Sequence, residues 1–155
     1  MKKVGIYSGS FDPVHVGHIG FALKARDQLD LDVVVFIPEE TPRSHDQLAP
    51  FADRLAMLSI ATQAHTSLMV DTLSDKQFTI ARSLPEVGRH YPDAKLFMLM
   101  GSDVVGTLSG RWPGLTELLE HVEFIVGLRN SDTPAMVAEK MIEITRATKT
   151  PVAFH

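Results

Sequence analysis

The sequence predicts an α/β protein with a doubly wound parallel sheet, and two observations lead to that fold class. Short apolar runs of strand length alternate with longer amphipathic stretches of helix length along the 155 residues. The apolar runs are almost continuously hydrophobic, which is typical of parallel strands covered by helices on both faces. Strands and helices that alternate connect by right-handed crossovers, and such sheets bind ligands beyond the carboxyl ends of their strands.

Five runs of strand length are rich in β-branched or aromatic residues, and a short sixth run follows near the end. In order they are Val4–Tyr7, Val33–Pro38, Leu68–Asp71, Lys95–Met100, Glu123–Leu128 and Val152–Phe154. Helices are expected over His18–Leu29, Asp53–Gln63, Thr79–His90, Leu115–His121 and Pro134–Arg146. The longest irregular segment, Glu39–Pro50, follows the carboxyl end of a strand, where substrate loops belong.

Helical spacing of apolar residues indicates which faces are buried. The residues expected to face the core are Leu55, Leu58 and Ala61 or Thr62 in the second helix, and Val137, Met141, Ile144 and Ile142 in the last. Pro134 suits a helix start. Pro85, inside the third helix, predicts a kink or a split.

Composition excludes several classes of function. The net charge is −4 and the pI about 5.9, so no global basic field favours nucleic acid or an anionic membrane. With no cysteine there are no disulfides or cysteine zinc sites, which fits a reducing compartment. No run of about 18 apolar residues predicts a membrane span, and the apolar run near the N-terminus is too short for a signal peptide. We expect a cytoplasmic protein that binds neither nucleic acid nor membrane; a homo-oligomer is compatible with these features.

The stretch GSFDPVHVGHIG, residues 9–20, is a poor core segment and looks like a backbone bent around a ligand. Gly9 allows a positive φ or a close backbone approach. The amides of Ser10 and Phe11 can then point at anionic oxygen, together with the N-terminus of the next helix. We expect Asp12 to bind local backbone amides and Gly17 to let a phosphate approach the helix start.

Two histidines, His15 and His18, follow in this loop. We expect both to face the same anion and to donate hydrogen bonds to charge that develops during a reaction. Two alternatives stay open: the pair could ligate a metal, although no third ligand is evident nearby, or both could be incidental.

The pattern GxFDPxHxGH resembles the signature of the HxGH nucleotidylyltransferase superfamily, and its matching residues are Gly9, Phe11, Asp12, Pro13, His15, Gly17 and His18. The resemblance implies a Rossmann-like fold over a single domain, 1–155. It implies transfer of a nucleoside monophosphate from a nucleoside triphosphate, with Mg²⁺ and without a covalent enzyme intermediate. It also implies that His15 and His18 contact the phosphates and stabilise the transition state.

Weaker segments resemble the nicotinate-nucleotide adenylyltransferase branch, which joins nicotinate mononucleotide to AMP. They are Arg54–Leu58 (RxxML), Gln77–Leu84 (YTxxTL), Phe97–Asp103 followed by Trp112 (Gly-x-Asp…Trp), and Phe124–Arg129, a late strand ending in arginine. The resemblance implies ATP and a mononucleotide as substrates. It places Phe78 and Thr79 on the acceptor side and Gly101 on the nucleotide side.

The residues themselves leave alternatives open in these segments. Asp103 could accept from ribose hydroxyls or cap a helix, and Arg129 could reach the nucleotide or form a solvated salt bridge. Trp112 could stack on a base or pyridine ring or simply pack. Arg43 and His45 could bind the substrate phosphate, or they could be surface charges of a mobile loop.

Three departures from the family pattern stand out. The PPHK-like loop is replaced by Thr41–His45, with Asp46 at the lysine position, and Phe78 replaces a tyrosine. The ISSTxIR segment, which in the family opens a helix holding the β- and γ-phosphates, has no counterpart in the printed sequence. We therefore expect domain 1–155 to lack it, by truncation, by a route that works without it, or with loss of activity.

The leading hypothesis is AMP transfer from ATP to nicotinate mononucleotide or a similar mononucleotide, with release of pyrophosphate. The same-class alternative is nucleotidyl transfer to another phosphorylated acceptor, or use of CTP, which the altered 41–46 loop motivates. A non-catalytic nucleotide-binding protein is the alternative from a different class. A structural or metal-binding domain is the last.

Overall fold

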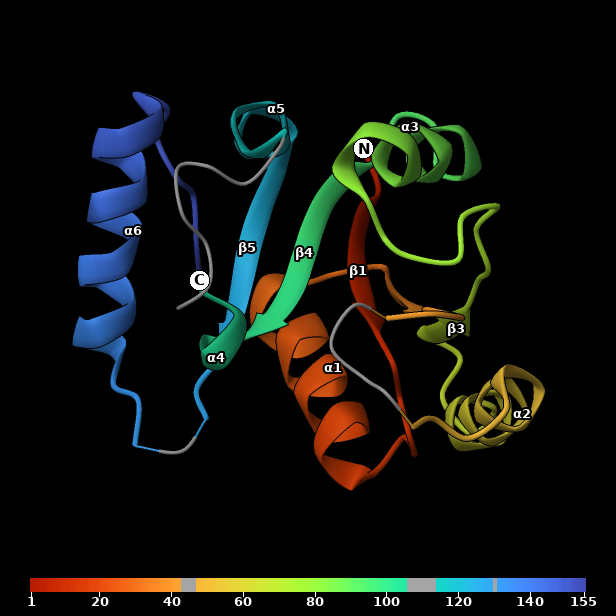
Figure 1. The fold of residues 1–155 in the computed structure, drawn as a ribbon. Coiled ribbons are helices and arrows are strands. Elements are labelled where there is room, and N and C mark those ends of the chain that lie inside the picture. Colours follow the sequence, from red (N-terminus) through yellow and green to blue (C-terminus); the bar gives the residue numbers. More distant parts are fainter. Residues whose placement is uncertain (43–46, 106–113, 130) are drawn as a thin grey trace.

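A computed structural model describes residues 1–42, 47–105, 114–129 and 131–155, and it shows one parallel sheet between two layers of helices (Figure 1). The strands are β1 (Lys3–Gly9), β2 (Val33–Pro38), β3 (Leu68–Val70), β4 (Lys95–Gly101) and β5 (Val122–Gly127). The helices are α1 (Val16–Leu29), α2 (Phe51–Thr62), α3 (Ile80–His90), α4 (Ser102–Val105), α5 (Leu115–His121) and α6 (Pro134–Thr148). The predicted fold class is confirmed.

The sheet order is β3-β2-β1-β4-β5, and all four strand pairs are parallel. The chain builds outward from β1 to β3, then crosses back and continues through β4 to β5. The first strand therefore lies at the centre, and the strand order reverses between β1 and β4. That reversal is where doubly wound sheets bind their ligands.

Two helical layers cover the sheet. On one face, Ala22 and Ala25 of α1 and Leu58 of α2 pack against strand residues such as Phe36 and Leu99. On the other face, α3, α5 and α6 cover the remaining strand side chains. Nearly every central strand residue is buried, which explains the unbroken apolar runs of the sequence. No helix of the described ranges is long and apolar enough to cross a membrane.

Three sequence predictions about individual elements are wrong. Val152–Phe154 is not a strand: only Phe154 bridges to β5, at Phe124, and Pro151 has no N–H to extend the ladder. α3 is one continuous helix across Pro85, so the predicted split is wrong, while the predicted kink stays a prediction. Buried Ile80 and Val87 lie on either side of the proline and hold the helix to the sheet.

Ile142 is the third error, since it is 52% exposed, whereas Val137, Met141 and Ile144 are buried as predicted. In α2 the buried stripe is Arg54, Leu58 and Thr62, so an arginine occupies a core-facing position.

Candidate nucleotide-binding site

A pocket of about 600 Å³ opens between the carboxyl ends of β1 and β4. The two strands pair only as far as Ile6 and Met98, and beyond that point they separate. The residues that line the pocket are Tyr7, Ser8, Gly9, Ser10, Phe11, His18, Glu39, Pro42, Phe78, Met98, Leu99, Met100, Gly101, Asp103, Val104 and Arg129. A volume of this size suits a small-molecule substrate or cofactor.

The turn after β1 is made at Phe11 and not at Gly9. Phe11 has a φ of 46°, while Gly9 ends the strand without a positive φ. The buried Phe11 ring packs edge-on against Tyr7 and Phe36, and this packing holds the backbone in the left-handed region. The expectation of a positive φ at Gly9 is therefore wrong. Close approach of a ligand to Gly9 stays a prediction.

The backbone amides of Ser10 and Phe11 have no hydrogen-bond acceptor among the residues that the structure describes. Both residues line the pocket. Backbone N–H groups are obligatory donors, so an unpaired pair beside a pocket is suited to anionic oxygen. The predicted function of these two amides stays a prediction.

His15 is the N-cap of α1. Its Nδ1 accepts a hydrogen bond from the Gly17 amide at 3.0 Å, and its own amide donates to Nδ1 of His18 at 3.1 Å. The two rings stack with centroids 3.8 Å apart. The two imidazoles form a capping box, in the positions that serine or threonine and glutamate usually occupy. Because this cap ends at His15, α1 begins at Val16, two residues before the predicted start.

Only His18 of the two lines the pocket. Because its Nδ1 accepts from the backbone, the neutral ring carries its proton on Nε2. Burial lowers the pKa of His18 from 6.5 to about 4, and the charges of His15 and Arg129 act in the same direction. His18 is thus a neutral Nε2–H donor at pH 7.

Gly17 makes room for the His15 ring. A Cβ atom at residue 17 would lie 2.8 Å from Cε1 and 2.9 Å from Nδ1 of that ring. The expected approach of a phosphate to Gly17 is not tested by this contact. Asp12 does not bind a local amide as predicted: Oδ1 accepts from the distant Ala49 at 3.4 Å.

The opposite wall of the pocket comes from β4 and the segment after β5. Nε of Arg129 lies 3.5 Å from Oδ1 of Asp103, and both side chains are about half exposed. The Arg129 amide donates to Oγ of Ser102 at 2.8 Å. Gly101 lacks a side chain where these groups lie, since a Cβ there would approach Nε of Arg129 to 2.5 Å. Arg129 and Asp103 therefore form the partly solvated salt bridge and also line the pocket.

The predicted acceptor-side residues fall into two groups. Phe78 lines the pocket, and its amide donates to Oε2 of Glu39 at 3.0 Å. Thr79 is the N-cap of α3, and its Oγ1 is buried with no partner among the described residues. Arg43, His45 and Trp112 lie outside the described residues.

Among the residues of this region to which sequence reasoning assigned no role are Tyr7, Glu39 and Arg54. Burial raises the pKa of Tyr7 above its ordinary value of 10, while the Arg129 guanidinium opposes that rise. Glu39 is a carboxylate of the pocket wall. Arg54 could have been found from its spacing, because it lies four residues before the core residue Leu58 on the same helical face.

No group of three or more histidine, cysteine, aspartate or glutamate residues suited to a metal ion occurs within the described ranges. Glu39 and Asp103 are the carboxylates among the described lining residues.

The chain matches the family described as "Cytidylyltransferase-like" over residues 6–150. It is 34% identical over 137 residues to the "Probable nicotinate-nucleotide adenylyltransferase" of Neisseria gonorrhoeae (strain NCCP11945), a match covering 86% of this chain and 68% of that protein. The protein of the same name from Geobacillus kaustophilus (strain HTA426) is 32% identical over 148 residues, covering 90% of this chain and 68% of its own length.

Solved structures share the fold. The Plasmodium falciparum nicotinic acid mononucleotide adenylyltransferase complexed with NaAD has a TM-score of 0.77 at 18% identity, covering 100% of this chain and 74% of that one. A putative nicotinate-nucleotide adenylyltransferase from Vibrio parahaemolyticus has a TM-score of 0.67 at 16% identity, covering 98% and 99%. At these identities the likeness shows the fold alone.

Proposed function

The chain belongs to the cytidylyltransferase-like family and, within it, to the nicotinate-nucleotide adenylyltransferases, and from that premise we propose that it transfers AMP from ATP to nicotinate mononucleotide and releases pyrophosphate. The observation that carries the proposal is the pocket wall at the strand-order reversal. There the amides of Ser10 and Phe11, which have no acceptor in the described part of the chain, line the same pocket as the neutral donor His18.

In the proposed mechanism the acceptor phosphate attacks the α-phosphorus of ATP in line with the departing pyrophosphate. The protein positions the two nucleotides and stabilises charge on the transferring group, without a covalent intermediate. His18 donates from Nε2 to a phosphate oxygen. His15 fixes the ring of His18 through the cap and offers its own Nε2–H as a second donor.

The remaining roles are assigned by position where the structure describes the residue, and by the family resemblance for Arg43, His45 and Trp112. Gly9, Ser10, Phe11 and Gly17 form the phosphate side. Gly101 leaves room for Asp103 and Arg129, which bind the ribose and phosphates of ATP. Phe78, Thr79, Arg43, His45 and Trp112 bind the mononucleotide, with Trp112 stacked on the pyridine ring.

Mg²⁺ is part of this proposal. The ion keeps several waters and binds through substrate phosphates with one or two carboxylates, so it needs no protein cage. Asp103 and Glu39 fit that requirement as the carboxylates of the described pocket wall. When bound with ATP, the ion neutralises phosphate charge. We also propose that domain 1–155 acts in the cytoplasm, which the absence of cysteine supports.

Pyrophosphate release from ATP, Mg²⁺ and nicotinate mononucleotide tests the proposal. We expect turnover that depends on both nucleotides; no release above background, beside an active control enzyme, contradicts it. Nicotinamide mononucleotide, sugar phosphates and CTP in the same assay separate this reaction from transfer to another acceptor. ATP binding by calorimetry without turnover on any acceptor would favour a nucleotide-binding protein that is not an enzyme.

A further inference from the structure

Arg54 is the largest fully buried side chain of the described residues, with 1% exposure. Its guanidinium donates to four backbone carbonyls from two separate segments, the loop after β1 and the connection between β2 and α2. The acceptors are Ser10 O at 2.7 Å, Glu39 O at 2.8 Å, Ala49 O at 3.0 Å and Glu40 O at 3.0 Å. Arg54 does not line the pocket.

The positive charge of Arg54 has no carboxylate partner among the described residues. A buried cation is costly unless its hydrogen bonds are satisfied. Carbonyl dipoles supply that compensation here, and the Phe51 ring lies 5.4 Å from the guanidinium carbon. The Arg54 guanidinium therefore holds backbone segments in place and does not neutralise a carboxylate of the described residues.

One of the four carbonyls fixes the phosphate side of the pocket. The Ser10–Phe11 peptide is trans, so its C=O and N–H point in opposite directions. Because Arg54 binds Ser10 O, the Phe11 N–H is directed away from the guanidinium. That amide is one of the two without an acceptor among the described residues. Hydrogen bonding at the carbonyl also polarises the same peptide and strengthens its N–H as a donor.

Two further carbonyls fix the acceptor side. Glu39 and Glu40 follow β2, and Arg54 binds both of their oxygens. The Glu39 amide donates to Gly9 O at 2.8 Å, and the Glu39 carboxylate accepts from Phe78. One guanidinium thus joins the loop after β1 to the loop after β2 and, through Glu39, to Phe78.

We infer that Arg54 is a positioning residue. It fixes the loop after β1, which carries the Ser10 and Phe11 amides for the ATP phosphates, relative to Glu39 and Glu40 after β2 on the acceptor side. This inference rests on the proposed function for the identity of the two substrates. Arg54 touches neither substrate, and its effect passes through the Phe11 amide and through Glu39. Lysine cannot replace it, because an ammonium has three donors on one point while the guanidinium has five in a planar fork.

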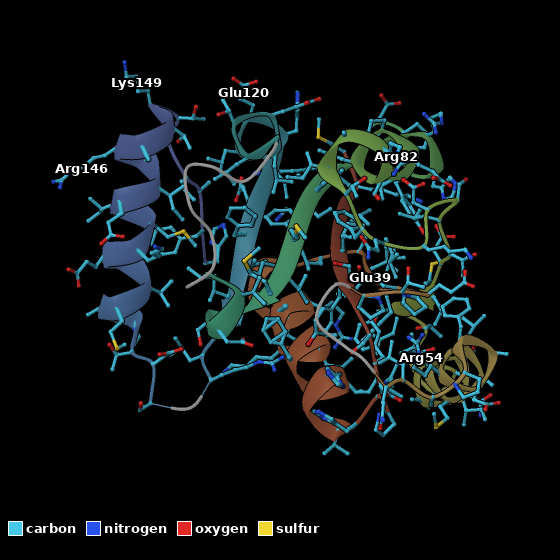
Figure 2. All side chains as sticks on the ribbon, in the orientation of Figure 1. Glu39, Arg54, Arg82, Glu120, Arg146 and Lys149 are labelled. Carbon is cyan, nitrogen blue, oxygen red and sulfur yellow. The ribbon has the colours of Figure 1, made fainter. Side chains whose placement is uncertain are left out.

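The test compares Arg54→Lys and Arg54→Met with Arg146→Met. Arg146 is an exposed arginine on α6, at the other end of the sheet from α2 (Figure 2). Misplacement of a reacting group by about 1 Å can cost about a hundredfold. We therefore expect folded Arg54→Lys to lose about a hundredfold in kcat/KM for both substrates together, with kcat reduced and not KM alone. Arg146→Met should match the parent.

Guanidinium ion at millimolar concentration should restore part of the turnover of Arg54→Ala, whose short side chain leaves the guanidinium position open, and ammonium should not. A folded Arg54→Lys with kcat and both KM values within twofold of the parent overturns the inference. Failure of both Arg54→Lys and Arg54→Met to fold also overturns it, because Arg54 would then act on stability alone.

ATP calorimetry separates this inference from the proposed function. If the parent releases no pyrophosphate, the proposed function fails, but the inference still requires Arg54→Lys to bind ATP at least about tenfold more weakly than Arg146→Met. Equal ATP affinity in those two variants, or no ATP binding by the parent, contradicts the inference.

Discussion

The two walls of the pocket are built differently. At the end of β1, the loop is held by bonds within the protein: the guanidinium of Arg54 on Ser10 and the histidine cap on α1. At the ends of β4 and β5, the Arg129 amide is bonded to buried Ser102, but the side chains of Arg129 and Asp103 meet in a half-exposed ion pair. We therefore expect the first wall to be preorganised and the second to adjust around its ligand.

The difference indicates a division of labour. Groups that stabilise a transition state must be fixed before the reaction, because reorganising them during it costs free energy. Groups that bind the ground state can settle around the ligand. We therefore expect substitutions at the β1 wall to lower kcat and substitutions at the β4 wall to raise KM. The predictions below test this contrast.

His18→Ala should have the largest effect. Removal of one preorganised donor costs about 10²–10³ in kcat, with ATP binding weakened much less. Steady-state kinetics measures kcat, and calorimetry measures the affinity for ATP. His18→Asn should keep part of the activity because an amide still donates. His121→Ala, at the end of α5, is the control, and a folded His18→Ala with the parent's turnover would remove His18 from the mechanism.

Arg129→Met should come next, and it should act on binding. Loss of a charge-assisted hydrogen bond costs about 1.5–3 kcal/mol, and half exposure of the side chain reduces that figure through solvent screening. We expect the KM for ATP to rise about tenfold and kcat to change by less than about threefold. A fall in kcat larger than the rise in KM would show that the β4 wall is as preorganised as the β1 wall.

His15→Ala should mainly destabilise the protein. An N-cap is worth about 0.5–2 kcal/mol, so the urea midpoint should fall while the fold persists. His15→Asn is the informative partner, because asparagine is a strong N-cap. If His15→Asn keeps the parent's stability and kcat, His15 is only a cap. If it keeps stability but loses turnover, the second phosphate donor of the proposed mechanism is supported.

Acid should weaken the folded protein through His18, and this effect is absent at neutral pH. Burial holds its pKa at about 4 in the folded chain, against about 6.5 when unfolded. Between these values the unfolded chain binds the extra proton, so stability falls as pH drops from about 6.5 to 4 and is unaffected above about 7. Urea unfolding at several pH values should show a shallower loss in His18→Asn; equal slopes would contradict the low pKa.

The fold was predictable because its signal is local. Unbroken apolar runs such as Val33–Pro38 report burial on both faces of a parallel sheet, and the structure has that strand at the predicted bounds. The place of His18 beside a pocket followed from its position in the loop after the first strand, at that strand's carboxyl end.

Other features depend on contacts between distant segments. Nothing near Arg54 in the sequence indicates that Ser10 and Glu39 supply its carbonyl partners. Likewise, the left-handed backbone at Phe11 follows from packing against Tyr7 and Phe36, so local rules assigned the turn to Gly9 instead.

We expect the central place of β1 to set the order in which the chain folds. β1 pairs with nearby β2, but its other neighbour is β4, where Lys3 pairs with Lys95. Contacts that close long loops form late, because the chain loses conformational entropy before the contacts stabilise it. The Arg54 contacts lie wholly within the early half, so the β1 loop can form before β4 docks, and docking completes the pocket. Nucleotide should therefore slow unfolding and leave the folding rate unchanged.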